Sequence, residues 1–241
     1  MSSIRKYTIA TFCALFALAV QAQDLGITIY KLNKASNNMQ SKLMGEVFTL
    51  TSDANYYFLY PGDWVTGTIT LVNGDVHDKL KLRYQAKSDE LISYNENGHF
   101  LFSVQKDQVK SFSFVDENIT RKFIRLTKLN NQHSSMYLEE LYNGSTSLLV
   151  NWYIFERTVS PYVDKNGLTR AVEYRLQKEY YLYGKQAGLQ KIKLNRRALY
   201  LQFPENKKEI RKILRQRQLL VQNEQSMVLA LSLLKENGII E

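Results

Sequence analysis

The chain has 241 residues, of which 44% are hydrophobic and 12% aromatic, and 32 lysines and arginines outnumber 23 aspartates and glutamates. This composition indicates a folded protein and excludes a disordered or collagen-like chain. A single cysteine also excludes a scaffold held together by disulfides.

The chain begins with the pattern of a secretory signal peptide. Arg5 and Lys6 precede an apolar run from Ile9 to Val20, and small residues lead up to Ala22. The run is shorter than the roughly 20 residues of a membrane span. We therefore predict that residues 1–22 are a signal peptide cleaved after Ala22, with an uncleaved anchoring helix as the alternative.

Export has two further consequences for the mature chain. The only cysteine, Cys13, leaves with the signal peptide, so we expect no disulfide and no thiolate chemistry. No later stretch has the length and apolar character of a membrane-spanning helix. We therefore predict a periplasmic or secreted protein of the cell envelope, without a transmembrane span.

Residues 23–194 are predicted to form a β-rich domain. Apolar and polar residues alternate with a period of two over residues 65–71, 80–84 and 112–114, which is typical of antiparallel strands with one buried face. Four Asn-Gly pairs predict hairpin turns: Asn73-Gly74, Asn97-Gly98, Asn143-Gly144 and Asn166-Gly167. The expected fold is mainly β (α+β), with an antiparallel meander or Greek-key sheet that forms a sandwich or a partly open barrel.

Two of the expected strands have additional features. Lys79, Lys81 and Arg83 alternate with apolar residues and should form the polar face of one strand. Residues 147–155 are apolar on both faces, which predicts a central strand covered on both sides.

Residues 195–241 are predicted to form a basic helical tail. Asn195 and Asn223 are suitable caps for two helices, and Gly238 is a suitable stop for the last one. Between them, Ile210, Ile213 and Leu214 form a narrow apolar stripe on a helix that is otherwise strongly basic.

This basic helix is the first candidate binding site. Its cations could contact an anionic lipid or glycan surface or an acidic partner protein, and they are Lys207, Lys208, Arg211, Lys212 and Arg215. The alternative is a solvated helix face whose stripe packs on the sheet. Nucleic acid is not expected as a partner, because the chain carries an export signal and no nucleic-acid-reading motif.

Clustered tyrosines are the second candidate binding site. Tyr56, Tyr57, Tyr181 and Tyr183 lie in aromatic runs, where alternate side chains must face outward if the runs are strands. Exposed tyrosines favour contact with protein or carbohydrate. Packing in the core or over a sheet edge is the alternative.

Histidines and paired carboxylates do not form a recognisable catalytic or metal site. His77, His99 and His133 lie beside turn-like sequence without the spacing of metal ligands, and we expect them to be exposed turn residues. Three carboxylate pairs occur, but neighbours on a strand point to opposite faces, and these pairs are Asp89-Glu90, Asp116-Glu117 and Glu139-Glu140. We therefore assign no catalytic residue, no metal ligand and no cofactor.

Parts of the β domain resemble a group of exported proteins of Gram-negative bacteria. The matching segments are residues 62–74, 82–84, 89–91, 109–112 and 137–149, followed by the lysine-rich helical end. The resemblance implies an envelope or secreted protein of bacterial origin. Its motifs are structural, so it implies no activity or active-site residue.

The sequence thus predicts a non-enzymatic envelope protein that binds another envelope protein or an anionic surface component. One alternative is a periplasmic carrier that holds a lipid or glycan in a β-barrel cavity. Another is a hydrolase that uses carboxylates from different strands.

Overall fold

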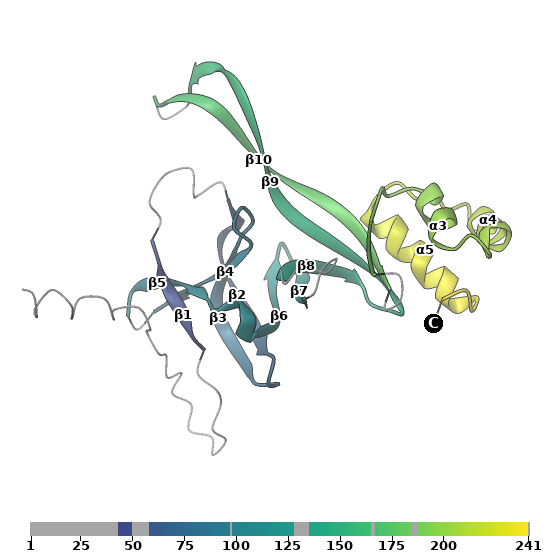
Figure 1. The fold of residues 1–241 in the computed structure, drawn as a ribbon, viewed down its shortest axis with the longest axis horizontal. Helices are drawn as coiled ribbons and strands as arrows, with labels where there is room; N and C mark the ends of the chain where they lie inside the picture. The colour runs from purple at the N-terminus through teal and green to yellow at the C-terminus, as the bar shows by residue number, and fades with distance from the viewer. Residues whose placement is uncertain are drawn as a thin grey trace, which may run out of the picture.

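A computed structural model describes residues 43–49, 58–96, 98–127, 135–164, 167–184 and 188–240. These residues form one antiparallel sheet of 11 strands, followed by three short helices near the C-terminus (Figure 1). The predicted mainly β fold with C-terminal helices is confirmed. The predicted signal peptide lies outside the described residues.

Apart from a 3-10 turn between β5 and β6, the strands come first in the chain and the helices last. The strands are β1 (Gly45–Phe48), β2 (Leu59–Leu71), β3 (Val76–Gln85), β4 (Glu90–Asn95), β5 (Phe100–Val104), β6 (Val109–Asp116), β7 (Ile119–Thr127), β8 (Ser135–Tyr142), β9 (Thr146–Val163), β10 (Thr169–Gly184) and β11 (Gly188–Ile192). The helices are the 3-10 turn η1 (Lys106–Gln108), α3 (Arg196–Gln202), α4 (Lys207–Gln216) and α5 (Glu224–Glu236).

Most neighbours in the sheet are also neighbours in the sequence, as in a meander. The strand order is β1-β5-β4-β3-β2-β6-β7-β8-β9-β10-β11, and β1 and β11 remain at the two edges, so the sheet is not closed. It nevertheless curls, since the turn before β4 lies against β8, where the carboxylate of Asp89 accepts a hydrogen bond of 3.2 Å from the backbone N–H of Tyr137. Strands β2–β8 therefore surround a common core, as in a partly open barrel.

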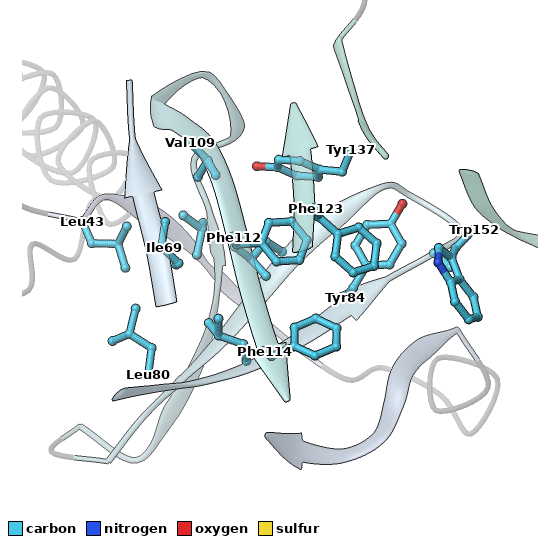
Figure 2. Close-up of a cluster of buried hydrophobic side chains, with 14 of the residues drawn as sticks. Leu43, Ile69, Leu80, Tyr84, Val109, Phe112, Phe114, Phe123, Tyr137 and Trp152 are labelled. Atoms are coloured by element: carbon cyan, nitrogen blue, oxygen red, sulfur yellow. The ribbon is translucent and has the colours of Figure 1, made fainter. Parts of the chain in front are cut away.

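Stacked aromatic rings fill this core (Figure 2). Phe112 and Phe123 stack with ring centroids 4.7 Å apart, and Tyr137 meets Phe112 edge-on at 5.1 Å. Tyr84 lies 5.2 Å from Phe123. Such aromatic contacts add stability beyond the burial of apolar area. These rings come from β3, β6, β7 and β8, and they hold the two sides of the curled sheet together.

The predicted turn and cap residues have the local geometry expected of them. Gly74 has a φ of 94° in the turn between β2 and β3, a conformation that glycine adopts without strain. The side chain of Asn195 accepts a hydrogen bond from the N–H of Ala198, and Asn223 forms a capping box with Ser226. These interactions satisfy N–H groups that the first helical turn leaves free.

The β9–β10 hairpin extends away from the rest of the molecule (Figure 1). Its inner end is covered, since Leu148, Leu149 and Val150 are fully buried. Its outer end is not, because Phe155 is 40% exposed and Val163 is 67% exposed. The predicted cover on both faces therefore holds at the inner end of residues 147–155 and is wrong at Phe155. We call residues 155–163 and 168–175 the arm.

The three helices pack on the inner end of this hairpin, next to the sheet (Figure 1). Leu148 of β9 and Leu182 of β10 belong to the same buried cluster as Leu199 of α3, Ile213 of α4 and Leu231 of α5. The helical tail is therefore docked on the sheet through a second core. In the part of the chain that the structure describes, no helix is both long and apolar enough to span a bilayer.

Candidate binding site

The predicted charged site lies on α4. Ile210, Ile213 and Leu214 are buried, as the predicted apolar stripe requires. All five predicted basic residues are exposed: Lys207, Lys208, Arg211, Lys212 and Arg215. At about 100° per residue, the five span an arc of about 140° next to the buried stripe. The structure therefore places these five cations on one face of the helix, which we call the basic face.

The basic face has few partners within the protein. Among the described residues, none of its five cations forms an ion pair with a carboxylate. The guanidinium of Arg211 lies over the ring of Tyr200 in α3, 5.9 Å from its centroid, where the two attract each other. Glu209 is the single acid of α4 and lies outside the basic arc. The face is thus free to attract an anion.

Side-chain contacts fix these helices relative to the sheet. Lys178 and Tyr180 of β10 both donate hydrogen bonds to Glu224 at the start of α5, at 2.7 and 2.9 Å. The guanidinium of Arg196 in α3 donates to the carbonyl of Leu219 at 3.0 Å, after the end of α4. The basic face therefore belongs to a docked helix, and a pre-ordered surface loses less entropy on binding than a mobile one.

The predicted tyrosine site is not joined to the basic face. Tyr56 and Tyr57 lie outside the described residues. Leu182 of β10 points into the helical core, so its neighbours Tyr181 and Tyr183 point to the opposite face of the sheet. The hydroxyl of Tyr181 donates to Glu179 at 2.8 Å. The structure therefore places the described tyrosines and α4 on different sides of the sheet.

A buried polar network joins strands of the barrel to β9, and the sequence did not reveal it. Glu139 accepts hydrogen bonds from Arg121 at 2.8 Å and from the Trp152 indole at 2.7 Å. Arg121 also contacts Asp116 at 3.3 Å, and the Tyr60 hydroxyl donates to Asp116 at 2.6 Å. The carboxylates are thus paired with donors, so we interpret this network as structural.

Asp89 forms a second polar cluster. Its carboxylate accepts hydrogen bonds from the Tyr84 hydroxyl at 2.8 Å, from the Tyr137 N–H at 3.2 Å and from the ammonium of Lys106. Burial raises the pKa of Asp89, while Lys106 acts in the opposite direction. Both carboxylate oxygens are occupied by donors, so Asp89 connects β3, η1 and β8 rather than serving as a free acid or base.

Asp89 and Glu90 do not both lie in a strand, as the argument about adjacent carboxylates assumed. Asp89 has a φ of 57° in the turn before β4, so strand alternation does not separate it from Glu90. Both line a hollow of about 930 Å³ beside β1 and β5. The argument from strand alternation therefore does not apply to this pair. A glycosidase needs two free carboxylates. In this pair the carboxylate of Asp89 is occupied by its hydrogen-bond donors.

The histidines differ from expectation at one position. His77 lies in β3 opposite Ile69 and is only 5% exposed, with both ring nitrogens lacking a hydrogen-bond partner. The predicted exposed turn position is therefore wrong for His77, because its side chain is on the buried face of β3. His99 is exposed in a turn, as predicted, and His133 lies outside the described residues. Within the described ranges, no three acidic or histidine side chains could hold a metal ion.

The core bears on the carrier alternative. A carrier needs a cavity inside the barrel, whereas the centre of the described barrel is occupied by packed rings, among them Phe114 and Phe123 at 5.6 Å. The hollow beside β1 borders this cluster at Val104, and none of the stacked rings lines it. The described geometry gives no support to a ligand held within the barrel.

The structure adds two basic residues that the sequence reasoning did not select. Lys193 is exposed before α3, and Arg197 is exposed in the first turn of α3. In the sequence, these two residues were indicated only by the Arg196-Arg197 pair directly after the helix cap Asn195.

Comparisons with protein-family models, curated proteins and solved structures found no match. The interpretation of the site therefore depends on its own geometry.

Because several tyrosines are buried or partly buried, we expect the protein to lose stability in alkaline solution. Burial raises the pKa values of Tyr84, Tyr137 and Tyr180, and burial together with Glu179 raises the pKa of Tyr181 to about 12. Above the ordinary tyrosine pKa of about 10, the unfolded chain loses protons that the folded chain keeps. The free energy of unfolding should therefore fall as the pH rises above about 10.

Urea unfolding at increasing pH, combined with tyrosinate absorbance, tests this expectation. The replacement Tyr181→Phe should make the decline less steep. Complete ionisation of the tyrosines in a chain that remains folded would contradict it.

Proposed function

We propose that the protein is an exported, non-enzymatic protein of the bacterial cell envelope that binds an anionic component through the basic face of α4. The observation that carries the proposal is the set of five exposed cations without carboxylate partners among the described residues. The signal-peptide pattern and the resemblance to exported proteins support the location.

The burial of the apolar stripe determines the kind of contact. A helix that inserts into a bilayer must offer its apolar side to the lipid, but Ile210, Ile213 and Leu214 are already used in the core. The contact that we propose for α4 is therefore electrostatic and lies at the surface of the partner. It should weaken with added salt, because salt screens exposed charges.

A second candidate is another envelope protein bound through the arm. Phe155, Tyr162, Val163 and Leu168 are exposed there. A two-stranded ribbon is marginally stable in water by itself, and the described contacts of the arm with the barrel are at its base. There Tyr174 meets Phe58 at 5.0 Å. Binding through apolar side chains would depend less on salt than binding through α4.

Charge reversal of α4 tests the first candidate. Replacing Lys207, Lys208, Arg211, Lys212 and Arg215 by glutamate should lower retention on isolated envelopes about a hundredfold at low salt. A basic residue near an anionic surface contributes about 1 kcal/mol, and not all five are expected to touch the surface at once. Retention is measured by co-sedimentation over a range of salt concentrations.

Matched variants separate a local effect from an effect of net charge. Lys208→Glu with Lys212→Glu should weaken retention, whereas Lys79→Glu with Lys110→Glu changes exposed lysines of the barrel by the same charge and should not. Unchanged retention of the five-residue variant, with loss of retention in a Tyr162→Ser, Val163→Ser and Leu168→Ser variant, would favour the arm instead.

A further inference from the structure

Two adjoining hollows lie where β11 meets α3. Their volumes are about 510 and 470 Å³, and Asn195 and Arg197 line both of them. The first also borders Lys191, Lys193 and Leu201, and the second also borders Arg196 and Leu220. The shared residues make the two hollows parts of one surface, next to the docked helices.

The linings are basic and contain no acid. Lys191 is paired with Glu179 at 2.6 Å, and Arg196 is engaged by the carbonyl of Leu219. Lys193 and Arg197 are exposed, and within the described residues neither side chain has an ion-pair or hydrogen-bond partner. Two free cations beside two engaged ones form a local excess of positive charge that favours an anion.

An exposed leucine borders each hollow. Leu201 is 70% exposed and Leu220 is 59% exposed, and each lines one hollow beside Arg197. In α3, Arg197 and Leu201 are four residues apart and so lie on the same side of the helix. The surface therefore presents a free cation and an exposed apolar side chain next to each other.

This surface is continuous with the basic face of α4. Tyr200 lies beside Leu201 in α3, and the guanidinium of Arg211 lies over the Tyr200 ring. The positive charge thus extends from α4 across Tyr200 to Arg197. We call Lys193, Arg197, Leu201 and Leu220 the junction surface.

We infer that the junction surface binds the headgroup of an anionic phospholipid in a bilayer. Lys193 and Arg197 would pair with the phosphate, and Leu201 and Leu220 would contact the apolar region just beneath it. A cation beside an exposed leucine suits a molecule whose phosphate adjoins an acyl chain. The inference deepens the proposed function and depends on it, because it assigns the anionic component to lipid.

Vesicle flotation of the purified protein tests the inference. The protein should float with phosphatidylcholine vesicles that contain phosphatidylglycerol and should not float with phosphatidylcholine alone. Lys193→Glu with Arg197→Glu should lower the partition coefficient at least about 25-fold, because the loss of each cation alone is worth about fivefold. Leu201→Ser with Leu220→Ser should lower it by at least about fivefold, also at salt concentrations that screen charge.

Matched controls make both effects specific. Lys79→Glu with Lys110→Glu changes the net charge equally, and Leu229→Ser removes a leucine that is 50% exposed on α5. Both controls should float like the unmodified protein. If the junction variants float like these controls, the inference is wrong. Binding of glycerol phosphate in solution without vesicle binding would also overturn the assignment to lipid.

The failure of this inference can be distinguished from failure of the proposed function. If the five-residue α4 variant loses envelope retention while the unmodified protein does not float with anionic vesicles, the partner is not phospholipid. The proposed function then stands and this inference falls. If the α4 variant keeps full envelope retention, the proposed function itself fails.

Discussion

Replacing Glu139 by alanine is expected to lower the free energy of unfolding by about 4 kcal/mol. Its carboxylate is only 2% exposed and accepts hydrogen bonds from Arg121 and Trp152. Without it, the Arg121 guanidinium keeps Asp116, at 3.3 Å, as its one carboxylate partner among the described residues, and the buried Trp152 N–H loses its acceptor. Leaving one member of a buried charged pair alone costs more than the intact pair contributes. Urea unfolding followed by circular dichroism measures the change.

Two other variants test whether the loss arises from this network. Glu139→Gln keeps an acceptor oxygen and should lose about half as much stability. Glu156→Ala removes an exposed carboxylate that pairs with Lys87 and should cost about 1 kcal/mol or less. Equal losses of unfolding free energy in Glu139→Ala and Glu156→Ala would show that the buried network stabilises the fold no more than an exposed ion pair does.

Removing the carboxylate of Asp89 should have the next largest effect and lower the free energy of unfolding by about 3 kcal/mol. Asp89 holds the Tyr84 hydroxyl, the Tyr137 N–H and the Lys106 ammonium. In Asp89→Ala these donors lose their acceptor, and the hydroxyl of Tyr84 belongs to a fully buried residue. The loss should weaken the connection that closes the β3–β4 turn over β8.

The neighbouring carboxylate provides a matched control for Asp89. Glu90 borders the same hollow, and Glu90→Ala should change the stability by about 0.5 kcal/mol or less. Hydrogen exchange should show faster opening at Tyr137 in Asp89→Ala than in Glu90→Ala, since this N–H loses its carboxylate acceptor. Similar exchange in the two variants would rule out the connecting role of Asp89.

The parts of the fold that follow from local rules could be predicted from sequence. Alternation placed Ile69 and Phe112 on the buried face, and the caps Asn195 and Asn223 mark the starts of helices as predicted. The apolar stripe of α4 predicted which side of this helix is buried, and therefore which side is exposed. Each of these features is decided within a few residues of the chain.

Features that depend on contacts between distant segments could not be predicted in this way. Asp89 meets Tyr137 only because the sheet curls, and Glu139 meets Trp152 only because β8 and β9 pair. Arg83 shows the same limit. Alternation assigned it to a polar face, but it is only 2% exposed because its guanidinium donates to the carbonyls of Pro61 and Gly62. Period-two patterns do not reveal such tertiary acceptors.

The arm and the junction surface show a related limit. Phe155 follows the same apolar pattern as Val150, but the core of the barrel covers only Val150. Lys193 and Arg197 are separated in sequence from the basic run of α4, and the packing of α3 brings them close to it. Which apolar and basic residues remain exposed therefore depends on the tertiary arrangement.

Spin labels on two single-cysteine variants would decide which surface meets the envelope. After removal of the predicted signal peptide with Cys13, a cysteine at Gln216 on α4 or at Val163 on the arm would be the only thiol. On adding isolated envelopes, we expect the resonance of the label at Gln216 to broaden, the label at Val163 to stay mobile, and added salt to reverse the change. Broadening at Val163 alone, insensitive to salt, would contradict binding through α4.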